Sequence, residues 1–216
     1  MLKPMTRVKI CGIRTLPDAL AAIEAGADLL GFNFYPKSAR FIQVQTCAGI
    51  AVALKQLHPA IQLTGVFVNA PLEAVQEIRQ TCKLDLVQLH GDESQAFCTA
   101  VGNGAFKAFR GVPDGELDSY ARKQAPAFLL DAHVTGFFGG TGVPADWQAA
   151  ASLAQLYPLL LAGGLNPENV AEAIQLVRPW GVDVASGVEI RPGDKDSGRM
   201  KAFVAAVRSV QVKVEP

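Results

Sequence analysis

The stretch PLLLAGGLNPENVAEAIQLVRPWGVDVASGVE, residues 158–189, has the pattern of one complete strand–helix–strand unit. Two short apolar runs, PLLLAGG and VDVAS, enclose a segment with helical spacing, in which apolar residues recur at positions 170, 173, 174 and 177. Asn166 followed by Pro167 places a capping residue directly before a proline suited to the first helical position. Strand runs that are apolar on both faces are typical of a parallel sheet covered by helices, so this stretch predicts a right-handed βαβ unit.

The same pattern extends along the whole chain. Six further strand-like runs come before this unit, namely RVKIC, DLLGFNF, QLTGVFV, LDLVQLH, GAFKAF and AFLLD, and the intervening LPDALAAIEAGA and PLEAVQEIRQTC have helical spacing. Eight alternating units predict an α/β fold, a (β/α)8 TIM barrel formed by residues 1–216 as a single domain. An open, doubly wound parallel sheet is the structural alternative, because periodicity does not show whether the sheet closes.

Charge and composition exclude several classes of partner. Twenty basic and twenty acidic residues cancel, and no run of five or more like charges occurs, so we expect no nucleic-acid partner and no anionic membrane surface as a partner. No apolar stretch is long enough to span a membrane, and the N-terminus MLKPMTRVKICG lacks the apolar run of a signal peptide, so we expect a cytoplasmic protein. Cys47, Cys82 and Cys98 lie in or near helical segments and are expected to be free thiols that pack in the interior. A small-molecule or protein partner is therefore expected.

The C-terminal ends of the strands, and the loops that follow them, carry the chemistry in barrels of this kind. Cys11 ends the first strand and precedes a glycine, so it is either a small apolar filler or a proton-transfer group that faces the mouth. A thiol has an ordinary pKa of about 8.5, and nearby positive charge, from Lys9 or from the helix dipoles of the phosphate site, could bring the pKa of Cys11 into the range of a general base. Asp131 ends the run AFLLD and is either a catalytic acid or a cap for the next segment.

Two further strand ends carry polar candidates. Arg40 in YPKSARF is either a solvated loop charge or a planar guanidinium that binds a substrate carboxylate through two hydrogen bonds. His90 ends the run LDLVQLH and is expected to be a polar group of the pocket. No metal is expected, because Cys11, His90, Asp92 and His133 are not paired at a zinc-binding spacing.

The loops after the last two strands predict a phosphate site. AGGLN contains Gly164, and ASGVE contains Ser186 and Gly187, so the backbone N–H groups of both loops can approach an anion closely. Barrels commonly bind phosphate at these two loops. No nucleotide or redox cofactor is expected, because GVEIRPGD has Asp194 where a Walker loop needs lysine, and GGTG at 139–142 does not directly follow a strand.

Six motifs, KICG, FYPKSARFI, VQLHG, LLDAHVTGFFGGTG, GGLNPENV and VDVASGVE, occur in this order at the ends of different strands. Together they closely resemble the phosphoribosylanthranilate isomerase family, barrel enzymes of tryptophan biosynthesis, and the resemblance covers essentially the whole chain. The chain has no room for a second barrel, so it is similar to the single-function form of the family and not to the form fused with indole-glycerol-phosphate synthase.

The resemblance implies a role for each candidate residue. Cys11 would be the general base, Asp131 the general acid, and Arg40 the residue that holds the anthranilate carboxylate. The remaining implied site residues are the phosphate-binding Gly140, Gly164, Ser186 and Gly187, and the pocket-lining His90 and Asp183.

The implied reaction is an Amadori rearrangement of N-(5-phosphoribosyl)anthranilate, a phosphorylated small molecule. Asp131 would protonate the ring oxygen to give an open-chain Schiff base, and Cys11 would remove the proton from C2. The resulting enolamine would tautomerise to 1-(2-carboxyphenylamino)-1-deoxyribulose 5-phosphate.

Two other functions remain open at this point. A phosphosugar epimerase would keep the phosphate site but would need a second carboxylate or a metal in place of Cys11. A catalytically silent barrel would bind a phosphorylated ligand as a regulator. The sequence leaves the oligomeric state open between a monomer and a homodimer.

Overall fold

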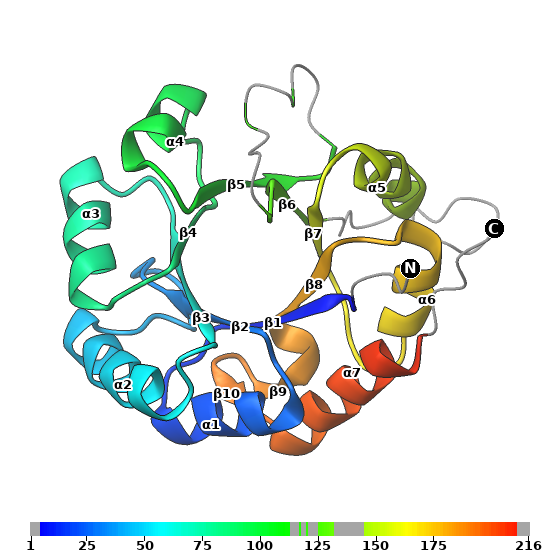
Figure 1. Cartoon of the computed structure of the whole chain (residues 1–216), viewed down its shortest axis with the longest axis horizontal. Coiled ribbons are helices and arrows are strands. Elements are labelled where there is room, and N and C mark those ends of the chain that lie inside the picture. The colour runs from blue at the N-terminus through cyan, green and yellow to red at the C-terminus, as the bar shows by residue number, and fades with distance from the viewer. Residues whose placement is uncertain (1–4, 113–116, 118–119, 121–124, 132–144, 211–216) are drawn as a thin grey trace.

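The computed structural model describes residues 5–112, 117, 120, 125–131 and 145–210, which form a ring of parallel strands surrounded by helices (Figure 1). The barrel strands are β1 (Arg7–Cys11), β2 (Leu29–Asn33), β3 (Gln62–Phe67), β4 (Leu86–Leu89), β5 (Ala105–Arg110), β6 (Phe128–Asp131), β7 (Leu159–Ala162) and β8 (Gly181–Val184). The helices are α1 (Leu16–Ala25), α2 (Val44–Leu57), α3 (Leu72–Thr81), α4 (Gln95–Val101), α5 (Ala145–Leu156), α6 (Val170–Val177) and α7 (Ser197–Ser209).

The sheet closes, which confirms the predicted barrel and excludes the open doubly wound sheet. Each strand pairs in parallel with the next one along the chain, and β1 also pairs with β8. In the closing register Val8 lies opposite Val182 and Lys9 opposite Asp183. The ring order therefore brings the first and last strands of the chain side by side.

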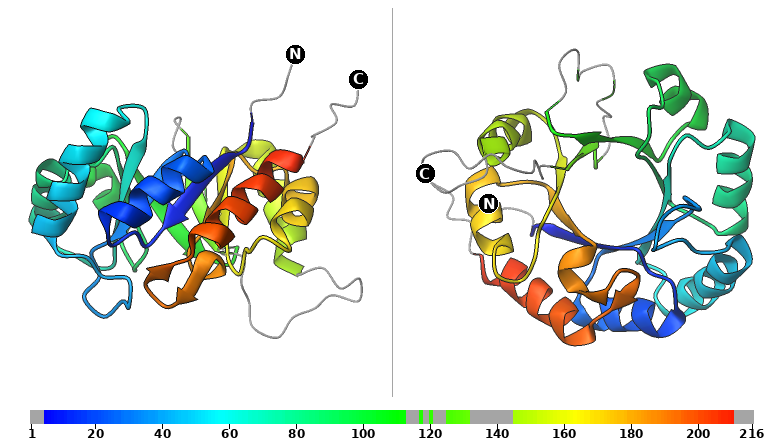
Figure 2. Two further views of the ribbon diagram at one scale, coloured as in Figure 1. Left: turned by 90° about the horizontal axis from the view of Figure 1, so that it is seen from below. Right: turned by 180° about the vertical axis from the view of Figure 1, so that it is seen from behind.

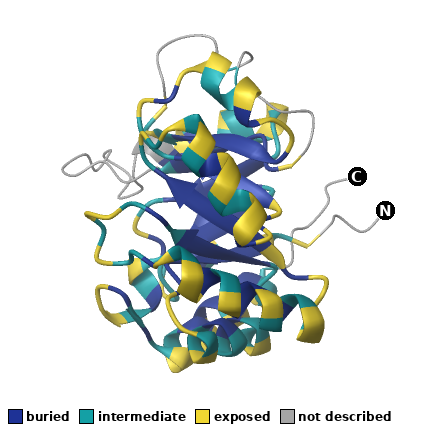
Figure 3. Cartoon of the chain, turned by 90° about the vertical axis from the view of Figure 1, so that its left-hand side faces the viewer, coloured by how far each residue is buried: buried dark blue, intermediate teal, exposed yellow. Residues whose placement is uncertain are grey.

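Two hydrophobic clusters hold the barrel together. The larger cluster lies between the outward-facing strand side chains and the helices, whose outer faces are exposed (Figure 3). A second, smaller cluster consists of inward-facing side chains, Leu29, Leu86, Phe106, Ala108, Leu129, Leu160 and Ala162. Other inward positions are polar and buried, among them Lys9, Thr64, Gln88 and Asp183. Part of the barrel interior is therefore polar, where barrels of this kind are usually filled by apolar side chains.

Helix α6 begins later than the sequence predicts. The Asn166–Pro167 pair was expected at its start, but the helix runs from Val170 with Asn169 as its N-cap residue. Asn166 instead accepts hydrogen bonds from the backbone N–H groups of Glu168 and Asn169 at 3.0 and 2.9 Å. The asparagine therefore caps a turn that leads into the helix, because its side chain satisfies the backbone donors of that turn.

After β8 the chain makes a short 3-10 turn, η2 (Ser186–Val188), and a two-stranded hairpin formed by β9 (Glu189–Arg191) and β10 (Asp194–Lys195). Figure 2 shows this hairpin at the end of the barrel opposite to the start of β1, where the C-terminal ends of the strands open. Within the described ranges, no helix has the length and hydropathy needed to cross a membrane.

Candidate active site

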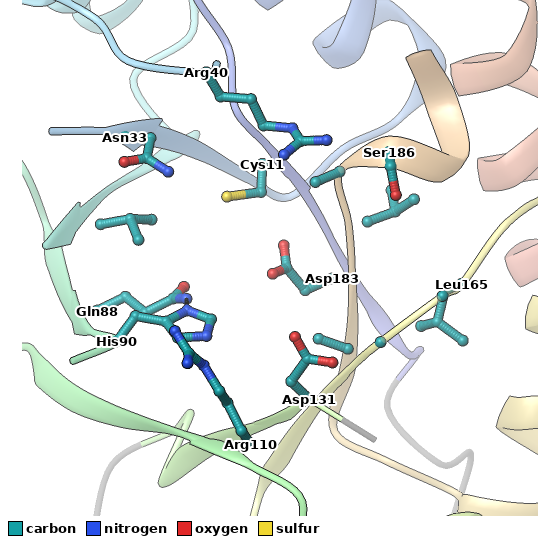
Figure 4. Close-up of a pocket in the computed structure, with 16 residues that line it drawn as sticks. Cys11, Asn33, Arg40, Gln88, His90, Arg110, Asp131, Leu165, Asp183 and Ser186 are labelled. Atoms are coloured by element: carbon teal, nitrogen blue, oxygen red, sulfur yellow. Dashed lines mark hydrogen bonds between the residues drawn. The ribbon is translucent and has the colours of Figure 1, made fainter. Parts of the chain in front are cut away.

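A cavity of about 580 Å³ opens at the C-terminal ends of the strands (Figure 4). Its walls are formed by Cys11, Asn33, Arg40, Val66, Gln88, His90, Arg110, Asp131, Ala162, Gly163, Gly164, Leu165, Asp183, Val184, Ala185 and Ser186. Seven of the predicted site residues are therefore brought together. Gly187 follows Ser186 directly but does not line the cavity, and Gly140 lies outside the described residues, as does His133.

Cys11 ends β1 with its side chain turned into the barrel, where the thiol is almost fully buried. The absence of a side chain at Gly31 makes room for it, because a Cβ at Gly31 would lie 2.7 Å from Cys11 Sγ and 3.1 Å from Lys9 Nζ. Burial raises the pKa of Cys11, and the positive charges of Lys9 and Lys195 only partly offset this rise. The positive charges do act to lower the thiol pKa, as expected, but the expected net decrease is wrong, because desolvation of the thiolate is the larger effect.

Lys9 lies inside the barrel with its side chain fully buried. Its Nζ donates a hydrogen bond to Asp183 Oδ1 at 2.9 Å. Burial acts to lower the pKa of Lys9, but the charges of Asp183 and Cys11 outweigh it, so that the pKa is raised and the ammonium group stays charged. A buried cation therefore lies beside a carboxylate and a thiol, those of Asp183 and Cys11, which both line the cavity.

Arg40 is held by an acidic residue from the opposite end of the sequence. Its Nε and Nη2 donate hydrogen bonds to the two carboxylate oxygens of Glu189 at 2.8 and 2.7 Å. Lys195 Nζ donates to the same carboxylate at 2.8 Å and to the carbonyl oxygen of Ala185 at 3.0 Å. The alternative of a solvated loop charge is wrong for Arg40, because one edge of its guanidinium is bound and the residue lines the cavity.

Asp131 ends β6, half-buried, and lies across the cavity from Cys11 (Figure 4). In the ring, β6 is separated from β1 by β7 and β8. A thiol and a carboxyl group placed in this way can act on opposite sides of one small molecule.

His90 follows β4 and is oriented by Gln88, two residues earlier on the same strand face. Gln88 Nε2 lies 3.0 Å from His90 Nδ1. Burial lowers the pKa of His90, although the carboxylates of Asp131 and Asp183 partly oppose this, so the imidazole is neutral near pH 7.

The loops after β7 and β8 lie in direct backbone contact. A Cβ at Gly187 would lie only 2.0 Å from the carbonyl oxygen of Leu165. Gly163 and Gly164 have positive φ angles of 99° and 64°, which favour glycine. The two loops contribute uncharged and mostly small residues, and no cationic side chain, to this part of the cavity lining.

Sequence reasoning overlooked several residues of the site. Gln88 lies within the motif VQLHG, two residues before His90 and therefore on the same strand face, which was the signal available for it. Glu189 ends the motif VDVASGVE and contacts Arg40, although it does not line the cavity itself. Arg110 ends β5, which, like β3, is a strand whose end was given no role. Within the described ranges, no three His, Cys, Asp or Glu side chains converge as metal ligands would.

The fold and this cavity define a (β/α)8-barrel enzyme whose active site faces the C-terminal ends of the strands. The family model for N-(5'phosphoribosyl)anthranilate (PRA) isomerase matches residues 8–206, and the chain belongs to this family. The N-(5'-phosphoribosyl)anthranilate isomerase of Geobacter sulfurreducens is 48% identical over 200 residues, which cover 93% of this chain and 97% of the relative. That of Geotalea uraniireducens is 47% identical over 206 residues, which cover 95% and 100%.

Solved structures of the family have the same fold. Phosphoribosyl anthranilate isomerase from Thermotoga maritima is 38% identical, with a TM-score of 0.79, over 94% of this chain and 99% of that one. A phosphoribosyl anthranilate isomerase in complex with reduced 1-(o-carboxyphenylamino)-1-deoxyribulose 5-phosphate is 38% identical, with a TM-score of 0.77, over the same shares of the two chains.

Proposed function

We propose that this protein isomerises N-(5'-phosphoribosyl)anthranilate to 1-(2-carboxyphenylamino)-1-deoxyribulose 5-phosphate in tryptophan biosynthesis, with Cys11 as general base and Asp131 as general acid. Membership of the isomerase family supports the reaction. The observation that carries the two roles is the placement of a thiol and a carboxyl group on opposite walls of one cavity (Figure 4).

The acid step opens the sugar ring. Asp131 gives its proton to the ring oxygen as the bond from that oxygen to C1 breaks, and the nitrogen lone pair forms the C1–N double bond of a Schiff base. The positive charge on nitrogen then weakens the C2–H bond, because electrons released there can flow to the iminium group.

The base step moves the double bond. The Cys11 thiolate takes the C2 proton, which gives an enolamine with a C1–C2 double bond. A proton then returns to C1 and the C2 hydroxyl loses its own, so that a ketone forms at C2 and no atom is gained or lost overall. Lys9, beside Cys11, favours the thiolate and counters the desolvation that raises the pKa of the thiol.

The two ends of the substrate have separate binding groups in this proposal. The backbone of the loops with Gly164, Ser186 and Gly187 supports phosphate binding, and Arg40 supports binding of the carboxylate. His90 and Asp183 line the wall between these ends. Binding at both ends would hold C2 close to the base and the ring oxygen close to the acid.

The decisive experiment is turnover of phosphoribosylanthranilate, made in place from anthranilate and phosphoribosyl pyrophosphate, by the wild type, Cys11→Ser and Asp131→Asn. Loss of anthranilate-type fluorescence, confirmed by NMR of the product with a chelator present, measures the reaction. We expect turnover by the wild type and by the control Cys98→Ser, whose thiol lies outside the cavity, and loss of at least about 100-fold in both site variants. A silent wild type would refute the isomerase proposal, and an active Cys11→Ser would refute the role of the base.

Arg40→Ala is expected to weaken binding of the product far more than binding of inorganic phosphate, because the guanidinium serves the carboxylate end only. The matched variant is Arg110→Ala, which removes the other guanidinium of the cavity wall. Titration calorimetry with both ligands makes the comparison. Equal losses for product and phosphate in Arg40→Ala, or a larger loss of product binding in Arg110→Ala, would contradict the assignment.

We further propose that the protein works in the cytoplasm, as a monomer or a homodimer. Its four cysteines are free thiols, in keeping with a reducing compartment. One of the similar structures consists of monomers made from a dimeric Thermotoga maritima enzyme. Light scattering coupled to gel filtration would decide between the two states.

A further inference from the structure

Glu189 is an acidic side chain buried between two cations, one of which, Arg40, lines the cavity. Only 3% of its side chain is exposed. It accepts two hydrogen bonds from Arg40 and one from Lys195, whose own side chain is fully buried. Burial acts to raise the pKa of Glu189, but these hydrogen bonds outweigh it and keep the pKa low, so that the group is a carboxylate.

Arg40 is constrained at two points along its length. A Cβ at Gly12 would lie 2.6 Å from Arg40 Cδ, so the aliphatic stem of Arg40 lies directly over the glycine that follows Cys11. At the other end, Glu189 occupies the edge of the guanidinium formed by Nε and Nη2. The donors left over are the two N–H groups of Nη1 and the second one of Nη2. They form the edge that remains for a ligand carboxylate in the cavity that Arg40 lines.

The cluster of Arg40, Glu189 and Lys195 has a charge suited to one carboxylate. Two cations and one anion leave a single net positive charge. Lys195 also donates to the carbonyl oxygen of Ala185, the residue directly before Ser186. The same cluster therefore connects the guanidinium to the loop after β8.

We propose that Glu189 is a positioning residue that sets the free edge of Arg40 at a fixed place relative to the loop after β8, and so makes the site selective for a ligand with a carboxylate at one end and a phosphate at the other. This inference rests on the proposed function, in which Arg40 binds the carboxylate. An arginine held in place in advance loses less conformational freedom when the ligand binds, and this is the source of the selectivity.

The test measures the selectivity for the carboxylate directly. Titration calorimetry compares the reduced product, 1-(2-carboxyphenylamino)-1-deoxyribulose 5-phosphate with its ketone reduced, with the same compound made from aniline, which lacks the carboxylate. The measured quantity is the selectivity ratio, the dissociation constant of the aniline compound divided by that of the carboxylated compound. It is determined for the wild type, Arg40→Ala, Glu189→Asp and Glu189→Gln. Glu189→Asp keeps the charge and shortens the reach by one methylene, so it tests geometry apart from charge. Circular dichroism of each variant checks the fold.

We expect Glu189→Asp and Glu189→Gln to lower the ratio roughly 10-fold, a loss of the size expected when a long side chain is no longer held in place. The affinity for the aniline compound should stay within about twofold of the wild type, because the proposed phosphate-binding loops are unchanged. Asp194→Asn is the matched control: it removes an exposed acid of the same hairpin whose partner is Arg191 and not Arg40. The ratio should not change in this control.

Four outcomes would overturn the inference. An unchanged ratio in both Glu189 variants would mean that Glu189 does not position Arg40 for the carboxylate, and a higher ratio would mean that Glu189 competes with the ligand for Arg40. Equal losses for both compounds would mean that Glu189 only supports the fold. An unchanged ratio in Arg40→Ala would overturn the carboxylate assignment of the proposed function itself, a result that the Glu189 variants alone do not give.

Discussion

Replacing Lys9 with methionine should shift the pH dependence of kcat/KM to higher pH. Lys9 is fully buried, and its Nζ lies beside Cys11 Sγ over Gly31 and 2.9 Å from Asp183. Burial raises the pKa of Cys11, and Lys9 is the strongest influence that opposes the rise. Methionine keeps the approximate shape without the charge. Because the proposed base is the thiolate, the rising limb of kcat/KM against pH must move upward when the thiol pKa rises further.

The size of the shift follows from the contact that is lost. A hydrogen bond to a charged group contributes about 1.5–3 kcal/mol. One pKa unit corresponds to about 1.4 kcal/mol, so the limb should move by about one to two units. At a fixed pH below the limb, kcat/KM should then fall about 10- to 100-fold. The carboxylate of Asp183, left without its cation, acts in the same direction because it also disfavours the thiolate.

The assay is kcat/KM for phosphoribosylanthranilate across the neutral and alkaline range, with Lys107→Met as the matched control. Lys107 is also buried and pairs with a carboxylate, Glu93, at 2.6 Å, but it is not one of the charged groups that act on Cys11. Both variants should lose thermal stability, because each leaves a buried carboxylate without its partner. Only Lys9→Met should move the limb. An unmoved limb in Lys9→Met, or an equal movement in Lys107→Met, would refute the reasoning.

Two further predictions concern the loops around the site. Gly187→Ala should weaken inorganic phosphate binding at least about 10-fold in calorimetry, because its Cβ would lie 2.0 Å from the carbonyl oxygen of Leu165. The control Gly198→Ala, whose Cβ would have only one neighbouring atom, at 3.2 Å, should bind phosphate as the wild type does. Burial acts to raise the pKa of Glu93, but hydrogen bonds from Lys107 and from backbone N–H groups outweigh it, so the folded-state pKa lies below the unfolded one. The resulting stabilisation is present above the unfolded pKa of about 4.3 and is lost as the pH falls through the folded pKa. Glu93→Gln should therefore lower Tm at neutral pH and make the decline of Tm in acid less steep. A decline of Tm as steep as that of the wild type would contradict this.

The sequence was sufficient for the barrel and for most of the site, and the physical reason is the same in both cases. Apolar runs at regular spacing specify parallel strands between helices, and parallel strands bring all their C-terminal ends to one edge. Cys11, Arg40, His90, Asp131 and the β7 and β8 loops could therefore be expected in one cavity before any side-chain contact was known.

The partners of these residues could not be read in the same way. Arg40 and Glu189 are 149 positions apart, and Lys9 and Asp183 are 174 apart, so their pairing depends on the closure of the ring and on side-chain reach. The net direction of the Cys11 pKa also depended on burial, which a spacing argument does not weigh against charge. The start of α6 was missed because Asn166 can cap a turn as readily as a helix.

In the proposed function, the pairing of cations explains how one cavity would bind two anionic groups and still perform acid–base chemistry between them. A lone buried cation beside Cys11 would attract the phosphate or the carboxylate to the centre, where the sugar must lie for reaction. Lys9 is instead paired with Asp183, and Arg40 keeps only the edge that Glu189 leaves. In our proposal, backbone N–H groups of the loops after β7 and β8 bind the phosphate. Each anion would then have one favourable place, at opposite ends of the ligand, and the sugar between them would be held where Cys11 and Asp131 can reach it from two sides.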